Sequence, residues 1–172
     1  MEKLRYPIGK FIFDSEITPQ KRTAWIHDIE SLPRELRRAV FGLSAEQLDT
    51  PYRDGGWTVR QLAHHIADSH MNAFIRWKLA LTETNPTIKP YNQDEWATTG
   101  DVTGFDVEAS LVLLDGLHSR WAWLLASLSP SDFQRTFNHP ESGKQTLDRQ
   151  LQLYAWHGRH HVAHIVLVKD SP

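Results

Sequence analysis

The spacing of apolar residues along the chain predicts four long amphipathic helices. Apolar side chains recur at intervals of three and four residues in four stretches, which is the period of an α-helix with one buried face. The stretches run from about residue 18 to 43, 58 to 83, 106 to 128 and 146 to 168. Helices of similar length pack most simply as a bundle, so we predict an all-α four-helix bundle in one domain spanning residues 1–172.

Residues at the edges of these stretches are typical of helix ends. Thr18 is an N-cap candidate and is followed by Pro19 at the first helical position. Thr58 stands three residues before Gln61, which is the spacing of a capping box. Pro33 lies inside the first stretch, where the missing amide hydrogen predicts a kink or a break.

Two connections between the stretches are more than simple turns. Residues 84–104 carry Pro86, Pro90, Gly100 and Gly104 without a sustained period. A connection of this length in a compact domain is either functional or loosely ordered. The loop before the fourth stretch contains turn-forming residues, including Gly143, and can form a short hairpin.

Composition and charge exclude several classes of function. The chain has 19 Lys and Arg against 21 Asp and Glu, a net charge of -2, and its basic residues are scattered, which argues against nucleic-acid and anionic-membrane partners. The absence of Cys excludes disulfides, thiolate metal sites and a Cys nucleophile. The N-terminal residues have no apolar stretch of signal-peptide length, and no window approaches the length of a membrane span, so we expect a cytoplasmic protein.

Histidines carry the most specific chemical signal. Seven of the ten fall in two short segments of the second and fourth helices, namely His64, His65, His70, His157, His160, His161 and His164. Side chains four residues apart share one face of a helix, so His160 and His164 can bind one ion. His161 stands where an H-E-x-x-H site has its Glu, which argues against a zincin-type peptidase mechanism.

A third ligand has to come from another helix, and the second helix offers two candidates. His65 lies beside the apolar residues of the buried face and is preferred to His64, which is rotated by about 100°. His157 can extend the site or hydrogen-bond a ligand. Asp68, one turn beyond His65, is a candidate for a hydrogen-bond partner of a ligand or a general base, with a solvated helix charge as the alternative.

Other polar residues have weaker functional interpretations. We expect His27, His70, His118 and His139 to be ordinary core or boundary residues. Three arginines are candidates for binding the carboxylate of a substrate, although each is also expected as an ordinary surface residue. They are Arg60, Arg76 and Arg159.

Several motifs carry a resemblance to a known family. The segments 6–9, 48–61, 64–72 and 154–165 resemble the YfiT-type proteins of the DinB superfamily, and the similarity covers nearly the whole chain. This resemblance implies a four-helix bundle with one divalent ion, zinc or nickel, on three histidines that fall on His65, His160 and His164. The chain departs from the family pattern at Gly158 and Arg159, where relatives tend to carry Ser and His.

The resemblance also implies a function. The family is described as cytoplasmic, homodimeric metal-dependent hydrolases, and some relatives in the superfamily transfer low-molecular-weight thiols such as bacillithiol. Three neutral imidazoles leave an open position on the ion that accepts water or a thiolate. We therefore predict a metal-dependent hydrolase of a small-molecule substrate. A thiol S-transferase using the same site is the alternative, and a non-catalytic bundle that binds metal or a partner is a third interpretation.

Overall fold

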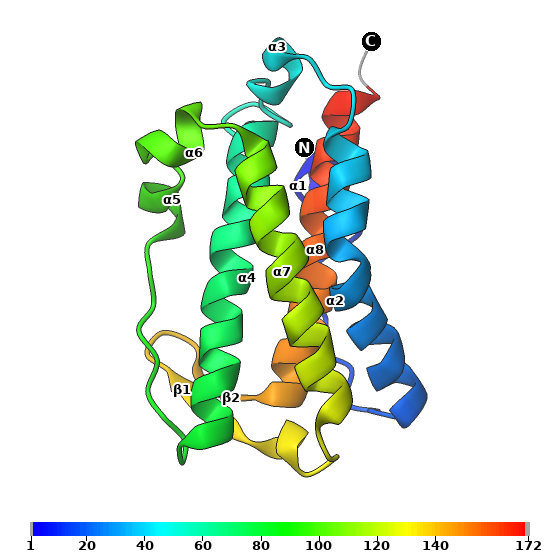
Figure 1. The fold of residues 1–172 in the computed structure, drawn as a ribbon, viewed down its shortest axis with the longest axis vertical. Coiled ribbons are helices and arrows are strands. Elements are labelled where there is room, and N and C mark those ends of the chain that lie inside the picture. The colour runs from blue at the N-terminus through cyan, green and yellow to red at the C-terminus, as the bar shows by residue number, and fades with distance from the viewer. Residues whose placement is uncertain (1, 171–172) are drawn as a thin grey trace.

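Four long helices form a bundle in the computed structural model, which describes residues 2–170 (Figure 1). They are α2 (Pro19–Val40), α4 (Val59–Thr82), α7 (Val107–Ser127) and α8 (Leu147–Lys169). Helices α2 and α4 each pack against both α7 and α8. This arrangement confirms the predicted fold class, and the helix ends lie within a few residues of the predicted ones.

The order of the helices explains the long connection after α4. Figure 1 shows that α2 and α8 run in one direction while α4 and α7 run in the other. Because α4 and α7 are parallel neighbours, the chain has to return along the bundle between them. Residues 83–106 make this return and contain two short helices, α5 (Gln93–Trp96) and α6 (Gly100–Gly104).

The remaining elements are short. Helix α1 (Glu2–Arg5) precedes α2, α3 (Ala45–Leu48) lies between α2 and α4, and the 3-10 helix η1 (Asp132–Gln134) follows α7. Strands β1 (Thr136–His139) and β2 (Gly143–Thr146) pair antiparallel, which confirms the predicted hairpin. Gly143 has a φ of 74°, a left-handed conformation that glycine adopts without a steric cost.

The predicted helix starts are confirmed, and Pro33 does not break its helix. The Thr18 side chain accepts a hydrogen bond from the Lys21 amide, and Thr58 and Gln61 form the capping box. Helix α2 continues through Pro33, which has no amide hydrogen to donate to the carbonyl of Ile29 four residues earlier. The Ile29 carbonyl is therefore available to a donor outside its own helix.

The apolar core consists of two clusters with buried histidines between them. One cluster contains Trp77 and Trp121, and the other contains Leu36 and Leu62. On α4 the first cluster begins at Ala73 and the second ends at Ala67, while His70 lies between them. The same interruption occurs on α7 and α8. Polar side chains inside a core need hydrogen-bond partners, so this layer has to form its own network.

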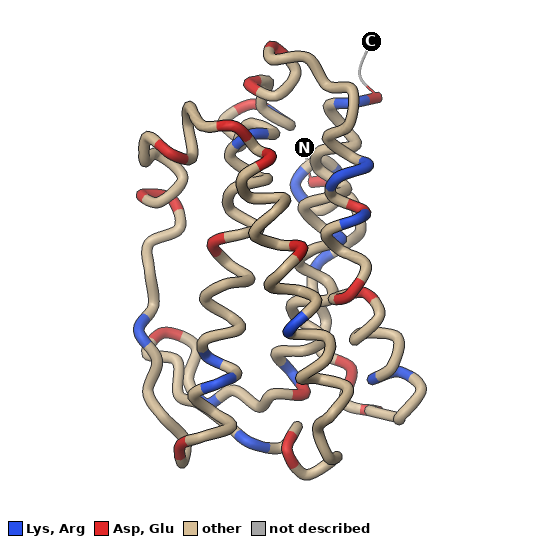
Figure 2. The backbone as a smooth tube through the Cα atoms, viewed as in Figure 1, with Lys and Arg blue, Asp and Glu red and all other residues tan. Residues whose placement is uncertain are grey.

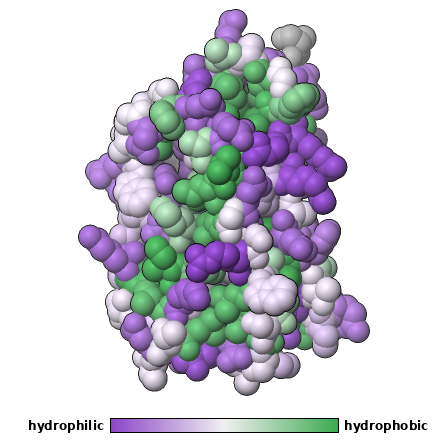
Figure 3. Space-filling view, in the orientation of Figure 1, coloured by the Kyte–Doolittle hydropathy of each residue, from purple (hydrophilic) through white to green (hydrophobic). Residues whose placement is uncertain are grey.

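The surface of the bundle mixes charges of both signs with scattered apolar side chains. Figure 2 shows basic and acidic residues interspersed over the molecule, and Figure 3 shows hydrophobic areas between hydrophilic ones. Exposed apolar residues on α7 include Val112, Leu113 and Trp123. Within residues 2–170, no helix combines the length and hydrophobicity that crossing a membrane requires.

Candidate metal centre

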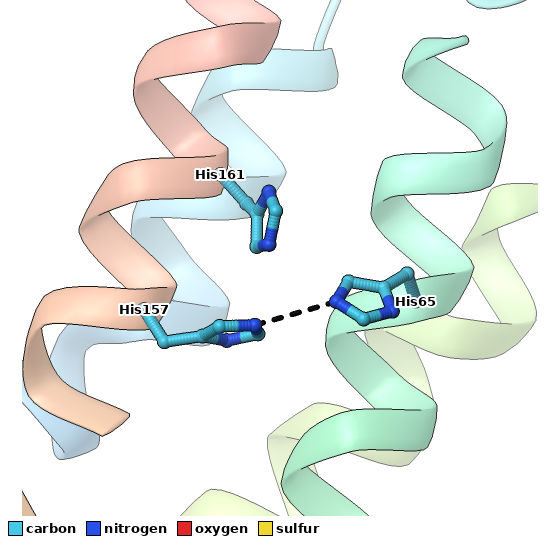
Figure 4. A group of neighbouring side chains, drawn as sticks. All are labelled: His65, His157 and His161. Carbon is cyan, nitrogen blue, oxygen red and sulfur yellow. Dashed lines mark hydrogen bonds between the residues drawn. The ribbon is translucent and has the colours of Figure 1, made fainter. Parts of the chain in front are cut away.

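Three histidines from two helices converge inside the bundle. His65 comes from α4, and His157 and His161 lie one turn apart on α8. Each offers one ring nitrogen, and these three atoms lie within 4.8 Å of one another. Figure 4 shows the three rings pointing toward a common space, with the Nε2 atoms of His65 and His157 3.3 Å apart. We call these residues the three-histidine group.

The structure does not bring the predicted set of His65, His160 and His164 together. Within the described residues, His65 has ring contacts with His157 and His161 and none with His160 or His164. The ring of His160 stacks on Trp156, with centroids 4.3 Å apart. The prediction placed His160 and His164 opposite α4, whereas in the structure His157 and His161 are the α8 histidines in contact with His65. Residues near the N-terminus cover the stripe of His160 and His164, and helical periodicity does not reveal which neighbour covers a face.

The two candidates on α4 point in different directions. The Nδ1 atom of His64 lies 2.7 Å from the Ser110 hydroxyl on α7, and its Nε2 lies 3.3 Å from the Phe105 carbonyl. His64 therefore contacts α7 and Phe105, the residue that follows α6, whereas His65 faces α8. Trp57 lies against His65, with ring centroids 4.6 Å apart, so it walls the site as well as packing.

A chain of buried histidines sets the tautomer of His157. A carbonyl can only accept, so His118 donates its Nδ1 hydrogen to the Ile29 carbonyl that Pro33 leaves available. The Nε2 atom of neutral His118 then accepts from Nδ1 of His70 across 3.1 Å. In the same way Nε2 of His70 accepts from Nδ1 of His157 across 3.1 Å. The lone pair of His157 is consequently on Nε2, the atom that faces His65.

A second, shorter series of hydrogen bonds sets the tautomer of His161. His164 donates its Nε2 hydrogen to the Arg5 carbonyl across 3.2 Å, which leaves the lone pair of His164 on Nδ1. Nδ1 of His161 lies 3.3 Å from that atom and is the donor. The lone pair of His161 is then on Nε2. His164, predicted as a ligand, thus links His161 to the Arg5 carbonyl in this structure.

Burial keeps these imidazoles neutral near pH 7. It lowers the pKa of His65 and of His118 to about 4. Burial, followed by the neighbouring histidines, also holds the pKa values of His70, His157 and His161 well below the usual range. A neutral imidazole has the lone pair that a metal ion requires.

The three-histidine group fits a divalent ion. Two nitrogens bound to one zinc ion at about 2.0–2.1 Å in a tetrahedral arrangement lie about 3.3 Å apart. The Nε2 atoms of His65 and His157 have this separation. The donor set is also appropriate, because His157 and His161 each donate the other ring hydrogen to a fixed partner, as metal-binding histidines usually do.

A second histidine group lies beside the first and fits less well. His160, His161 and His164 also have ring nitrogens within 4.8 Å of one another, and Nδ1 of His160 is buried without a hydrogen-bond partner among the described residues. However, His160 and His161 are adjacent in sequence, so their side chains leave the helix about 100° apart. His157 and His161 instead share one face with each other and oppose His65 on α4.

Asp68 lies on α4 and is half-buried. Burial, and then the charge of Asp101, raise its pKa to about 6. Among the described residues, its carboxylate makes no hydrogen bond to a histidine. The predicted support of a ligand by Asp68 is therefore not seen, and a general-base role stays a prediction.

Two cavities meet the three-histidine group. A cavity of about 580 Å³ has His157 in its wall, and a cavity of about 370 Å³ has His161 in its wall. Gln93 of α5 lines both. The connection between α4 and α7 therefore helps to enclose the space beside the histidines, as the functional interpretation of this connection predicts.

His157 was predicted to extend the site or to hydrogen-bond a ligand, whereas no ligand role was predicted for His161. His157 and His161 have the same four-residue spacing as His160 and His164, so the spacing alone favoured neither pair. His70 and His118 were expected to be ordinary core residues, although both take part in the chain that ends at His157. His70 and His118 both lie on the apolar faces of their helices, and this position can be read from the sequence.

Comparison with known proteins agrees with this architecture. The family model of the DinB superfamily matches residues 28–165. A protein of Bacillus mycoides, provisionally named a metal-dependent hydrolase, is 56% identical over 170 residues, covering 99% of this chain and 98% of the relative. A Bacillus cereus protein with the same provisional name is 56% identical, covering 98% of this chain and 97% of its own.

A solved structure is also similar. YfiT from Bacillus subtilis, described with the same provisional activity and an unusual four-helix bundle topology, aligns with a TM-score of 0.94. It is 46% identical, and the alignment covers 97% of this chain and 96% of that one.

Proposed function

The chain belongs to the DinB superfamily, and on this premise we propose that it is a metal-dependent hydrolase whose divalent ion is held by His65, His157 and His161. One observation carries the proposal. The three ring nitrogens converge beside two cavities, and hydrogen bonds direct the lone pairs of His157 and His161 to Nε2. This ligand set differs from the one predicted from the sequence.

The ion, zinc or nickel by the family resemblance, would polarise a carbonyl and acidify the water that attacks it. The contribution of the protein is to hold three neutral donors in place. Because none of the three imidazoles carries a negative charge, they would not offset the charge of a bound ion. The two apolar clusters on either side of the histidine layer keep the ligand helices in register.

Thiol S-transfer by the same site is the second candidate, and the pair of cavities favours it. A reaction between two substrates needs room for both, and the cavities beside His157 and His161 provide separate spaces. The chain has no Cys, so a sulfur nucleophile would have to come from a bound low-molecular-weight thiol.

The two candidates are separated by the atom that the product gains. Zinc- or nickel-loaded protein is incubated with a panel of small esters, amides and electrophilic halides, with and without a small thiol, in water enriched in oxygen-18. Hydrolysis adds labelled oxygen whether or not the thiol is present. Thiol transfer forms a thioether or thioester only when the thiol is present.

Metal-free protein and His157→Ala serve as controls, and both should be inactive. Thiol-dependent conjugates without labelled product would replace the hydrolase assignment with the transferase. Inactivity of the loaded protein in every arm would contradict both and favour the non-catalytic interpretation.

A further inference from the structure

The larger cavity contains a buried arginine that makes no ion pair among the described residues. Arg76 of α4 is 9% exposed and lines the cavity of about 580 Å³ that also reaches His157. Among the described residues, no carboxylate forms an ion pair with Arg76. Arginine is rarely buried to this extent without a partner, because removing its charge from water is costly.

Other arginines of this bundle show how it normally treats a guanidinium. Arg22 is partly buried and makes two hydrogen bonds to the carboxylate of Asp148, at 3.0 and 3.1 Å. Arg60 pairs with Asp49, and Arg159 lies 3.5 Å from a carboxylate oxygen of Asp28. Among Arg60, Arg76 and Arg159, only Arg76 is buried without an ion pair in the described part of the chain.

Three hydroxyl groups lie near Arg76 in the wall of the cavity. Burial raises the pKa of Tyr91 to about 12 and also raises that of Tyr154, although Arg76 and Ser69 interact with the Tyr154 hydroxyl and oppose the shift. Both phenols therefore remain protonated near pH 7. With Ser69 they bring three hydroxyl groups to the wall of the cavity that contains Arg76.

The charges of the wall disfavour a doubly charged anion. Arg76 contributes one positive charge, and Glu141 contributes a negative charge to the same wall. Burial, and then Arg76, lower the pKa of His139, so this residue adds no charge at pH 7. A planar guanidinium binds a carboxylate through two parallel hydrogen bonds. Glu141 would repel a phosphate dianion more strongly than a carboxylate, which carries one negative charge.

We propose that the Arg76 cavity binds the carboxylate of a small substrate whose reacting group lies at the three-histidine group. Arg76 follows His65 by eleven residues, about three helical turns, so the two side chains share a face with Cα atoms about 16 Å apart. The carboxylate and the reacting group therefore belong to opposite ends of the substrate. This inference deepens the proposed hydrolase function and rests on it for the identity of the reacting end.

The test measures carboxylate binding without a metal, because a carboxylate can also bind to an ion. Metal-free wild-type protein and metal-free His161→Ala are titrated by NMR with hexanoate, with its neutral analogue hexanamide and with inorganic phosphate. We expect hexanoate to shift the Arg76 Nε–H resonance in both proteins and to bind about 10- to 100-fold more tightly than hexanamide. Phosphate should bind more weakly than hexanoate.

Variants then assign the binding to one arginine. Arg76→Met should lose the same 10- to about 100-fold in hexanoate affinity, and Arg76→Lys, which keeps the charge without the planar fork, should lose less. Arg159→Met removes an exposed arginine from the neighbouring helix α8 and should bind hexanoate like the wild type. The NMR shift of Arg76 in the wild-type protein tests the proposal even where a variant folds poorly.

Three results would overturn the inference: equal affinity for hexanoate and hexanamide, hexanoate binding that leaves the Arg76 resonance unmoved, or tighter binding of phosphate than of hexanoate. The outcome is independent of the hydrolase assay. If hexanoate binding depends on Arg76 but the protein has no hydrolase activity, the hydrolase assignment is contradicted and the carboxylate site stands. If the protein is an active hydrolase but hexanoate does not bind through Arg76, the carboxylate site is contradicted and the hydrolase assignment stands.

Discussion

At the scale of single residues, the tautomers of the histidines connect the fold to the proposed chemistry. Two backbone carbonyls, of Ile29 and Arg5, each determine which nitrogen of a histidine carries the hydrogen. The choice passes along hydrogen bonds until the lone pairs of His157 and His161 lie on Nε2. Pro33 contributes by its missing amide hydrogen, which leaves the Ile29 carbonyl to His118.

The first prediction concerns His118, which contacts His70 and no member of the three-histidine group. Replacing it by Leu removes the acceptor of His70 and frees the tautomer of His157. Loss of such support typically weakens metal affinity about 10- to 100-fold. Competition with a chelator measures the affinity, and nitrogen NMR of His157 reports its tautomer. His27→Leu, on the exposed side of α2, is the matched control and should bind metal like the wild type. Equal metal affinity in the two variants would contradict the proposed role of the hydrogen bonds from His118 to His157.

A second prediction uses the raised pKa of Asp68. Because its pKa in the folded protein is about 6, against 3.8 ordinarily, the charged form is disfavoured by folding. The carboxylate therefore costs stability that appears as pH rises from about 4 to 6. After allowance for its partial exposure, Asp68→Asn should raise the free energy of unfolding of metal-free protein by about 1 kcal/mol at pH 8.

The same variant should have nearly wild-type stability at pH 4, where folded Asp68 is already neutral. Urea unfolding at the two pH values makes the comparison. A gain that is equal at both values would show that the effect is unrelated to the charge of Asp68.

At the scale of elements, the contact between α2 and α8 positions two of the proposed ligands. Gly158 follows His157 on α8 and faces α2. A Cβ atom at this position would lie 2.6 Å from Cδ2 of Leu32. Gly158 thus allows a close approach of α8 to α2 at the level of the histidine layer.

We expect Gly158→Ala to lower the free energy of unfolding by about 1–2 kcal/mol, because overpacking outweighs the gain in helix propensity. In a Leu32→Ala background the space is present, so the added methyl group should cost much less. Chemical denaturation of the wild type, the two single variants and the double variant measures the cost of the methyl group in both backgrounds. The same cost in both backgrounds would show that Leu32 is not the obstacle.

The sequence predicted the helices well and their mutual packing less well. Apolar periodicity, Thr18 and Thr58 located the elements because these signals are local. The ligand set was harder, since His157 with His161 and His160 with His164 are equally regular on α8. Choosing between these pairs requires knowing that Tyr6 and Arg5 lie against one of them, and such contacts join residues about 150 positions apart.

At the scale of the whole molecule, the bundle places a layer of neutral imidazoles between two apolar clusters and leaves cavities beside it. The predicted homodimer, the cytoplasmic location and the absence of nucleic-acid partners stay predictions. The metal should also contribute to stability, because an ion that binds only the folded state adds its binding free energy to folding.

Thermal unfolding should therefore respond to a chelator. A metal concentration about 100 times its dissociation constant corresponds to roughly 2.7 kcal/mol of stabilisation, which EDTA should remove from the wild-type protein. His65→Ala should unfold at the same temperature with or without EDTA. An equal response to EDTA in the two proteins would place the stabilising ion elsewhere.

The central claim is that His65, His157 and His161 hold the ion, and metal content tests it most directly. Wild-type protein and single alanine variants are reconstituted with zinc or nickel, dialysed and measured by elemental analysis. We predict about one ion per chain in the wild type and in His160→Ala, and loss of the ion in His65→Ala, His157→Ala and His161→Ala. Loss in His160→Ala together with full occupancy in His157→Ala would contradict the ligand assignment.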